Sequence, residues 1–369
     1  MDSVKASFQD AVFEDGYMWV FDNLIQAICR IDVDKFGMEI ISDYKGEKRF
    51  NAQKIFLIQD KFYLVTRESA EISIYDRKRQ GEDTTFFLQK PTVNENSTKY
   101  VGFFSYKNNI YLFPKYIDNG VVCFETSIEK YSKKDFLQPP LRAKLGDGDL
   151  ILRCFSFYKE SMWFVLNRAG VYGKYDFADG SADLYQTDTT SNLLSGICFD
   201  GEHVWLAETD SNHVICEGKQ IIDVLGEQSY WGLYPTAEGI FIPPYKSDKL
   251  IFIEEGTCKV TIKSLPLTIK EKRQVINHHF RDHDDFVYLF PLYSDPLFVL
   301  NKKDGEIKRV KIRCKNYVET CLTDNKIPLR EDEDIDIDWL LHFLDESCSL
   351  TCGQVRDRNE AGRAIWESI

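Results

Sequence analysis

Residues 100–124 read YVGFFSYKNNIYLFPKYIDNGVVCF, and this stretch predicts three short strands in succession. Residues 100–104 form an apolar run, as expected for a strand that is buried on both faces. The Lys-Asn-Asn at 107–109 favours a tight hairpin turn, because asparagine tolerates the positive φ that such turns need. Residues 110–113 and 121–124 are then the second and third strands, with a loop between them that starts at Pro114. A more polar fourth strand is expected to follow.

The second strand of this unit is a hydrophobic–aromatic–hydrophobic triplet that occurs seven times along the chain. The copies are Met18-Trp19-Val20, Phe62-Tyr63-Leu64, Ile110-Tyr111-Leu112, Met162-Trp163-Phe164, Val204-Trp205-Leu206, Ile240-Phe241-Ile242 and Val287-Tyr288-Leu289. Their central aromatics lie 36 to 52 residues apart. A repeat of about 40–50 residues made of short strands is typical of a β-propeller, with one four-stranded blade per repeat. We therefore predict an all-β fold, a seven-bladed β-propeller of four-stranded antiparallel blades over residues 1–313.

The chain resembles a divergent β-propeller in this general pattern only. The Gly-His and Trp-Asp pairs of WD40 repeats are absent, as are the paired glycines of kelch repeats. The resemblance therefore implies no functional residue, and the propeller scaffold itself does not dictate a chemistry. Two modes of ring closure stay open. The last repeat contains its own outer strand at 306–311, so packing between blades can close the ring, or a strand near Tyr317-Val318 can join it.

Composition excludes several classes of partner. The chain has 46 Lys and Arg against 59 Asp and Glu, and a net charge of −13 argues against a nucleic-acid partner, which needs clustered cations. No stretch reaches about 18 consecutive apolar residues, so no membrane partner is expected. The N-terminus lacks the apolar core of a signal peptide. Five cysteines lie inside apolar strand patterns, as buried free thiols do: Cys29, Cys123, Cys154, Cys198 and Cys216. We therefore expect a cytoplasmic protein.

The character of the sequence changes at residue 314, where we predict a C-terminal helical extension over 314–369 that packs on the propeller. Apolar residues recur there at helical spacing, at Ile337, Leu340, Leu341 and Leu344. Trp339 and Phe343 lie beside them. Two interpretations stay open: a structural cap under the propeller, or an element that docks a partner.

Loops between the second and third strands of a propeller open on one face, where binding sites usually form. Three of them share a proline, a tyrosine and a following acid, and supply Tyr116 with Asp118, Tyr245 with Asp248, and Tyr293 with Asp295. The tyrosine offers a flat ring and a hydroxyl. These residues either face a ligand or belong to the repeat architecture, with tyrosine packed on the next blade and aspartate capping the turn.

The matching loops of the other blades supply a mixed polar rim: Asp22, Asn23, Arg67, Glu68, Asn167, Arg168, Glu208, Thr209 and Asp210. Arg67 and Arg168 are its strong cations, and guanidinium groups suit carboxylates or phosphates. We therefore predict a ligand-binding site from Arg67, Tyr116, Asp118, Arg168, Tyr245, Asp248, Tyr293 and Asp295. Its ligand is expected to carry an acidic group and a flat surface.

Enzyme motifs give no comparable signal. His279 and His283 have a spacing that aligns two rings on a helix, yet they lie in an inner strand and its turn. No glycine-rich phosphate loop, nucleophile elbow or calcium loop is present. We expect no catalytic residues, no metal and no cofactor.

The expected function is a non-catalytic recognition or scaffolding module that binds a peptide, protein or glycan through loops on one propeller face. The alternative is a propeller enzyme of lyase or hydrolase type that uses loop carboxylates and a channel histidine, His278 or His279.

Overall fold

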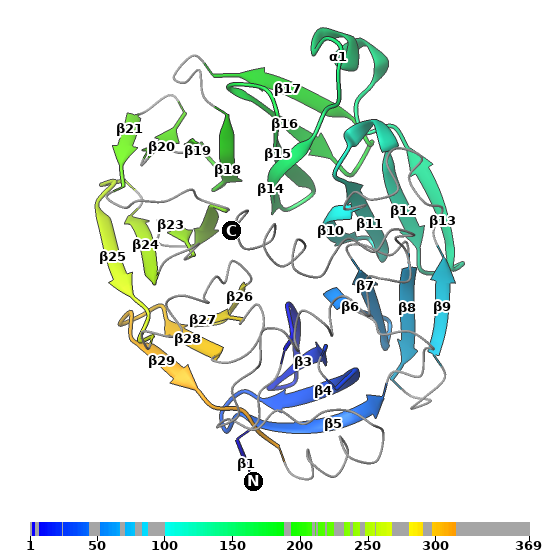
Figure 1. The fold of residues 1–369 in the computed structure, drawn as a ribbon, viewed down its shortest axis with the longest axis vertical. Helices are drawn as coiled ribbons and strands as arrows, with labels where there is room; N and C mark the ends of the chain where they lie inside the picture. The colour runs from blue at the N-terminus through cyan, green and yellow to red at the C-terminus, as the bar shows by residue number, and fades with distance from the viewer. Residues whose placement is uncertain are drawn as a thin grey trace, which may run out of the picture.

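Seven antiparallel sheets follow one another in chain order around a ring in the computed structural model (Figure 1). The prediction of a seven-bladed β-propeller is thereby confirmed. The structure describes residues 2–3, 7–23, 25–43, 52–66, 71–77, 83–87, 100–187, 193–208, 211, 213–217, 220–224, 232–236, 239–243, 248–254, 256–267, 280–290 and 297–314. The C-terminal residues 315–369, where the helical extension is expected, lie outside the described residues, and the extension stays a prediction.

Each blade is a meander of four consecutive strands that runs from the inner to the outer edge of the ring (Figure 1). Blade 1 contains β2 (Ala11–Glu14), β3 (Tyr17–Asp22), β4 (Ala27–Asp32) and β5 (Gly37–Asp43); blade 2 contains β6 (Ala52–Ile58), β7 (Lys61–Thr66), β8 (Glu71–Asp76) and β9 (Asp83–Phe87). Blade 3 contains β10 (Tyr100–Tyr106), β11 (Asn109–Pro114), β12 (Val121–Glu125) and β13 (Lys130–Lys134); blade 4 contains β14 (Leu152–Tyr158), β15 (Ser161–Leu166), β16 (Val171–Asp176) and β17 (Ala182–Gln186). Blade 5 contains β18 (Leu194–Phe199), β19 (Val204–Glu208), β20 (His213–Cys216) and β21 (Gln220–Asp223); blade 6 contains β22 (Tyr234–Thr236), β23 (Gly239–Ile242), β24 (Lys249–Glu254) and β25 (Val260–Ser264). Blade 7 contains β26 (Phe280–His283), β27 (Phe286–Leu289), β28 (Leu297–Asn301) and β29 (Ile307–Val310).

The seven central aromatics all lie on second strands, as predicted, and all are buried. Each is the third residue of its strand except Trp205, which is the second residue of β19. The difference follows from the first hairpin of blade 5, where Phe199 pairs with Val204 across a longer turn. In blade 1 the same hairpin closes over Asp15 and Gly16 alone, both at positive φ, as a two-residue turn requires.

The aromatic triplet supplies both faces of each blade, because successive side chains on a strand point to opposite sides. In blade 1, Trp19 packs toward blade 2, with its ring centroid 5.0 Å from that of Phe62. Its neighbours Met18 and Val20 pack toward blade 7, in one cluster with Tyr288. The same division recurs around the ring, so that a hydrophobic cluster fills each of the seven interfaces between neighbouring blades.

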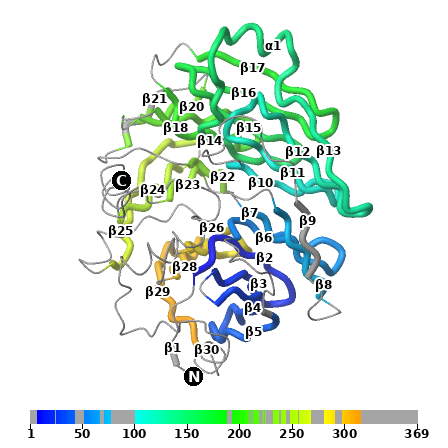
Figure 2. The backbone as a smooth tube through the Cα atoms, turned by 45° about the vertical axis from the view of Figure 1, so that its right-hand side comes forward, coloured from blue at the N-terminus to red at the C-terminus, as the bar shows by residue number. Residues whose placement is uncertain are grey.

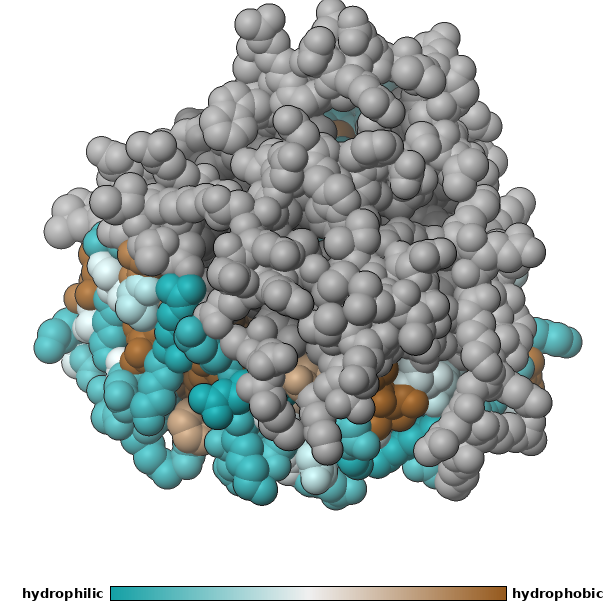
Figure 3. Space-filling model, turned by 60° about the horizontal axis from the view of Figure 1, so that its bottom comes forward, coloured by the Kyte–Doolittle hydropathy of each residue, from teal (hydrophilic) through white to brown (hydrophobic). Residues whose placement is uncertain are grey.

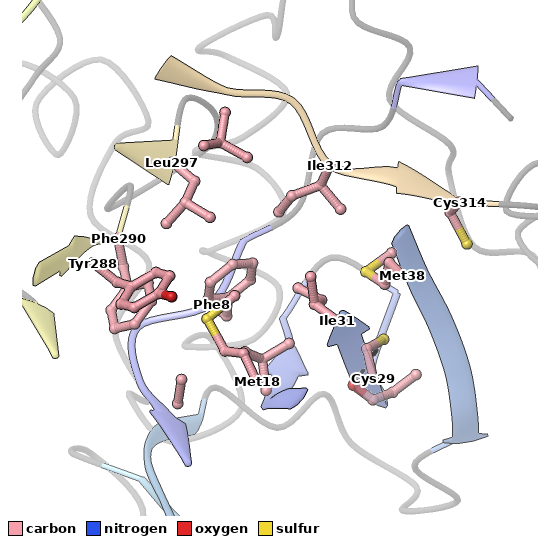
Figure 4. Packing of buried hydrophobic residues seen from close by; sticks show 14 of the residues in the cluster. Phe8, Met18, Cys29, Ile31, Met38, Tyr288, Phe290, Leu297, Ile312 and Cys314 are labelled. Atoms are coloured by element: carbon pink, nitrogen blue, oxygen red, sulfur yellow. Dashed lines mark hydrogen bonds between the residues drawn. The ribbon is translucent and has the colours of Figure 1, made fainter. Parts of the chain in front are cut away.

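The interface between blades 7 and 1 closes the ring, and both ends of the described chain reinforce it. After β29 the chain crosses to blade 1, where β30 (Arg313–Cys314) pairs in parallel with β5 and β1 (Asp2–Ser3) pairs with β30. Figure 4 shows Phe8 and Met18 facing Tyr288 and Phe290, with Ile312 and Cys314 along the same cluster. The outer strand expected at 306–311 is present as β29. The alternative strand near residues 317–318 lies outside the described residues.

Candidate functional site

The loop between β11 and β12 in blade 3 is held rigidly while one carboxylate stays exposed. It forms a short 3-10 helix, η1 (Ile117–Asn119), that ends at Gly120 with φ +72°. A side chain at Gly120 would bring its Cβ to 2.6 Å from the Lys134 carbonyl, so this close turn needs glycine. Ile117 is buried, and its amide donates to the Leu150 carbonyl at 3.0 Å. The turn therefore fixes the backbone on both sides of Asp118, whose side chain is 45% exposed.

Asp118 is bound by an arginine from the long crossing between blades 3 and 4. This crossing contains α1 (Pro139–Lys144), which lies at the outer rim of the ring beside blade 4 (Figures 1 and 2). Arg142 donates to both carboxylate oxygens of Asp118, at 2.7 and 3.0 Å, and this pairing raises the pKa of Arg142. It also donates to the carbonyls of Gly146 and Gly148, at 2.7 and 3.0 Å. Arg142 therefore ties the crossing to the loop of blade 3.

The matching loop of blade 4 is anchored to the same crossing. The Asn167 side chain accepts a hydrogen bond from the Ile151 amide at 2.8 Å and donates to the Asp149 carbonyl at 3.0 Å. Arg168 donates to the carbonyls of Asn167 and Asp147, at 3.1 and 3.3 Å. In the part of the chain that the structure describes, no carboxylate forms an ion pair with Arg168. The described hydrogen bonds of the Arg168 guanidinium are therefore with backbone carbonyls alone.

We call these residues the loop cluster: Tyr116, Asp118, Arg142, Asn167, Arg168 and the exposed residues 146–149. Tyr116 belongs to it because its backbone forms an isolated bridge with Ile151. The structure therefore brings three of the predicted site residues, Tyr116, Asp118 and Arg168, into one network. That these residues contact a ligand stays a prediction.

The other predicted site residues are not joined to the loop cluster by any described contact. Asp248 belongs to blade 6, which blade 5 separates from blade 4 along the ring. Its side chain is only 13% exposed, with one carboxylate oxygen 3.8 Å from the Lys249 ammonium. Arg67, Tyr245, Tyr293 and Asp295 lie outside the described residues.

Arg142 is the member of the cluster that sequence reasoning missed. Arg142 follows two prolines at the start of α1. A short basic segment between two blades is typical of a linker without a functional role. A signal was available, since the crossing is much longer than the loops around it and ends in the run Gly146-Asp147-Gly148-Asp149. The sequence around Asp118 does not indicate that Arg142 binds this carboxylate.

A second arrangement on the same kind of loop involves a carboxylate and a histidine in blade 5. Glu208 ends β19 with its side chain 8% exposed. One of its oxygens accepts a hydrogen bond from the Ser211 hydroxyl at 2.9 Å and lies 3.3 Å from His213 Nδ1. His213 is 48% exposed, so a large part of the imidazole beside Glu208 reaches solvent. A carboxylate next to a histidine ring nitrogen is an arrangement that general bases use.

His278 and His279, the histidines expected near the channel, lie outside the described residues. His283 is described and stacks on Phe13, with ring centroids 4.2 Å apart. Within the described ranges, no group of three or more His, Cys, Asp or Glu side chains is arranged to hold a metal ion. The helices in those ranges include none long and apolar enough to span a bilayer.

Surface hydrophobic residues do not single out another site. On the side drawn in Figure 3, hydrophilic side chains predominate among the described residues, with hydrophobic ones scattered between them. The most exposed large hydrophobics lie on four different blades: Ile128, Tyr131, Tyr185, Ile262 and Phe286. Single exposed residues of this kind are normal on a folded protein.

No family model matches the sequence, and no curated protein matches it either. Solved structures of similar fold include virginiamycin B lyase from Staphylococcus aureus, with a TM-score of 0.55 and 12% identity, covering 79% of this chain and 93% of that one. They also include YCF48 bound to D1 peptide, with a TM-score of 0.56 and 10% identity, covering 78% and 91%. Kluyveromyces lactis Hsv2 has a TM-score of 0.52 and 10% identity, covering 83% and 99%. At such identities the likeness shows the fold alone.

Proposed function

We propose that this chain is a recognition module that binds a protein, peptide or glycan through loops on one propeller face, with the loop cluster as the contact surface. The observation that carries the proposal is Arg168, a fixed guanidinium whose charge no described carboxylate neutralises. A carboxylate or other acidic group of the partner would complete its hydrogen bonds. Tyr116, half-buried in the neighbouring loop, adds a flat aromatic surface beside it.

The rigidity of the loop cluster supports binding without large rearrangement. Arg142 and Asn167 fasten the crossing to the loops of blades 3 and 4, so ordering these loops costs a partner little entropy. Asp118 contributes differently from Arg168, because Arg142 already occupies both of its oxygens. We therefore assign Asp118 the task of positioning the crossing, and Arg168 the contact with the partner. Among proteins of this fold, YCF48 is described bound to a peptide.

We also propose that the protein is located in the cytoplasm. The cysteines that the structure describes are free thiols, and all but Cys258 are buried. Burial raises the pKa of Cys154 to about 11 and raises the pKa of Cys198 well above its usual value, which keeps these thiols protonated and unreactive. Free buried thiols are typical of proteins from reducing compartments.

The experiment is a screen of the full chain on immobilised peptide and glycan arrays, followed by affinity measurements on the strongest hit. Arg168→Ala should weaken that binding about 10- to 100-fold, as expected for one lost charge-assisted hydrogen bond. Tyr116→Ala should weaken it as well. The matched controls are Arg309→Ala and Tyr131→Ala, which remove an exposed arginine and an exposed tyrosine from outer strands. Equal affinity in all four variants would exclude the loop cluster as the binding surface.

The Glu208–His213 pair favours a second candidate, an enzyme of lyase or hydrolase type that uses a loop carboxylate to orient a base. A catalytically inactive variant of the staphylococcal lyase is described with quinupristin, which makes that compound a direct probe. In this case the full chain should consume quinupristin, His213→Gln should not, and His203→Gln at the opposite end of β19 should behave like the unchanged chain. Persistence of quinupristin with all three proteins excludes this substrate.

A further inference from the structure

Three charged side chains from three blades meet at the inner edge of the ring. Asp10 directly precedes β2 of blade 1, Lys54 lies on β6 of blade 2, and Arg281 lies on β26 of blade 7. Blade 1 separates blade 7 from blade 2 along the ring, so a side chain that touches both must lie toward the axis of the ring. Figure 1 shows β6 and β26 among the innermost strands. We call the three residues the channel cluster.

Asp10 is the shared acceptor of the channel cluster. Its side chain is 6% exposed, with one oxygen 2.5 Å from Arg281 Nη2. The other oxygen accepts the Ile55 amide at 3.0 Å and lies 3.7 Å from the Lys54 ammonium. Arg281 also donates through Nε to the Ala11 carbonyl at 3.2 Å. Both oxygens of the only carboxylate in the cluster are therefore engaged.

Among the described residues, the two cations of the channel cluster have more hydrogen-bond donors than acceptors and more positive than negative charge. Lysine has three N–H donors and arginine has five, and the described contacts use only a minority of them. Lys54 is 21% exposed and Arg281 is 31% exposed, so part of each side chain reaches solvent. Two positive charges against one negative charge leave the channel cluster with a net charge of +1 among its described members.

The titration of Lys54 reflects the same imbalance. Burial lowers the pKa of Lys54 to about 8, the nearby charge of Arg281 acts in the same direction, and Asp10 opposes both only in part. Burying a second cation beside a carboxylate that is already paired is unfavourable, because only an oppositely charged partner offsets the free energy lost on desolvation. A bound anion would supply that partner.

We propose that Lys54 and Arg281 form an anion-binding site on the inner edge of the ring, which takes one oxyanion group, a carboxylate or a phosphate, of a small-molecule ligand. The guanidinium of Arg281 suits two oxygens of such a group, and the ammonium of Lys54 adds a point charge beside it. Asp10 holds both cations in position and does not touch the ligand. This site is formed by inner strands of blades 7, 1 and 2, so it does not depend on the loop cluster of blades 3 and 4.

The first test measures the acylation of Lys54 by an amine-reactive reagent as a function of pH, with peptide mapping by mass spectrometry. The full chain is compared in chloride, acetate and inorganic phosphate at matched ionic strength. A bound anion stabilises the ammonium form, so acetate or phosphate should move the labelling midpoint of Lys54 upward and reduce its labelling severalfold near the former midpoint. Lys61, which lies on β7 and pairs with Glu129 in a turn of blade 3, is the internal reference and should not respond.

The second test uses thermal midpoints and does not require that the reagent reach Lys54. Added phosphate or acetate should raise the midpoint of the unchanged chain, of Lys54→Arg and of the control Lys61→Met, relative to chloride. Lys54→Met should show no such rise. A response to phosphate alone assigns the site to phosphate groups, and a response to acetate alone assigns it to carboxylates. The proposal is overturned if neither anion has an effect, or if Lys54→Met responds as strongly as Lys61→Met.

Discussion

Phe290→Ala tests whether the closing interface holds the ring together as a single cooperative unit. Phe290 has no exposed surface and lies in the hydrophobic cluster between blades 7 and 1. Its ring meets that of Phe8 edge to face, with centroids 5.4 Å apart. Removing a fully buried phenylalanine loses its transfer free energy and leaves a cavity, which together cost about 3–5 kcal/mol.

The assay is equilibrium unfolding in urea, with Phe286→Ala as the matched control. Phe286 is the first residue of β27, the strand that Phe290 directly follows, yet it is 37% exposed, so its removal should cost about 0.5 kcal/mol or less. A loss of about 3–5 kcal/mol is a large part of the 5–15 kcal/mol that stabilises an ordinary domain. The Phe290→Ala protein should therefore fold but unfold at a clearly lower urea concentration.

The slope of the free energy of unfolding against urea concentration distinguishes two possible effects of Phe290→Ala. Because this slope scales with the surface exposed on unfolding, an unchanged slope means that all seven blades still unfold together. A smaller slope would mean that the ring had already opened at its closing interface. If Phe290→Ala and Phe286→Ala are destabilised equally, the packing of Phe8, Phe290 and their neighbours is not as described and the reasoning is refuted.

Two further predictions concern charged groups. The folded-state pKa of Lys54, about 8, lies below its ordinary value of 10.5. Between these two pH values the unfolded chain binds more protons than the folded protein. The free energy of unfolding should therefore rise with pH from about 8 to 10.5. Lys54→Met should lack this contribution, and a pH-independent difference between the two proteins in urea titrations would contradict it. Asp118→Asn weakens the bond to Arg142, so the backbone amides of residues 145–150 should exchange hydrogen faster. The free energy of unfolding of the whole protein should fall by only about 1 kcal/mol or less, because the Asp118–Arg142 pair is partly exposed. Unchanged exchange would show that Arg142 does not hold the crossing.

The fold could be predicted because its signal is local and repeated. A triplet such as Met18-Trp19-Val20 is a short apolar run typical of a strand buried on both faces, and the turn before it contains residues that adopt positive φ. Each blade carries this pattern within its own residues, so seven independent copies support one conclusion. The one irregular position, Trp205, differs because a single turn is longer, and its burial is unaffected.

The candidate site could be predicted only in part. Tyr116, Asp118 and Arg168 are predicted as site residues from their place after a second strand, because strand order puts equivalent loops at the same end of each blade. Sequence position could not show that Arg142 already binds Asp118, because that contact depends on how the crossing between blades 3 and 4 folds back.

The repeated pattern alone predicts seven blades and places the central aromatic of each on a second strand, because these features depend on patterns within a few dozen residues. Only the tertiary structure shows which residues contact each other across the closed ring. The pairing of β30 with β5 is two residues long and joins segments from opposite ends of the described chain. Asp10, Lys54 and Arg281 are ordinary charged residues in three separate repeats, and only closure of the ring places them together. Contacts of this kind leave no local pattern, since they depend on the geometry of the whole ring.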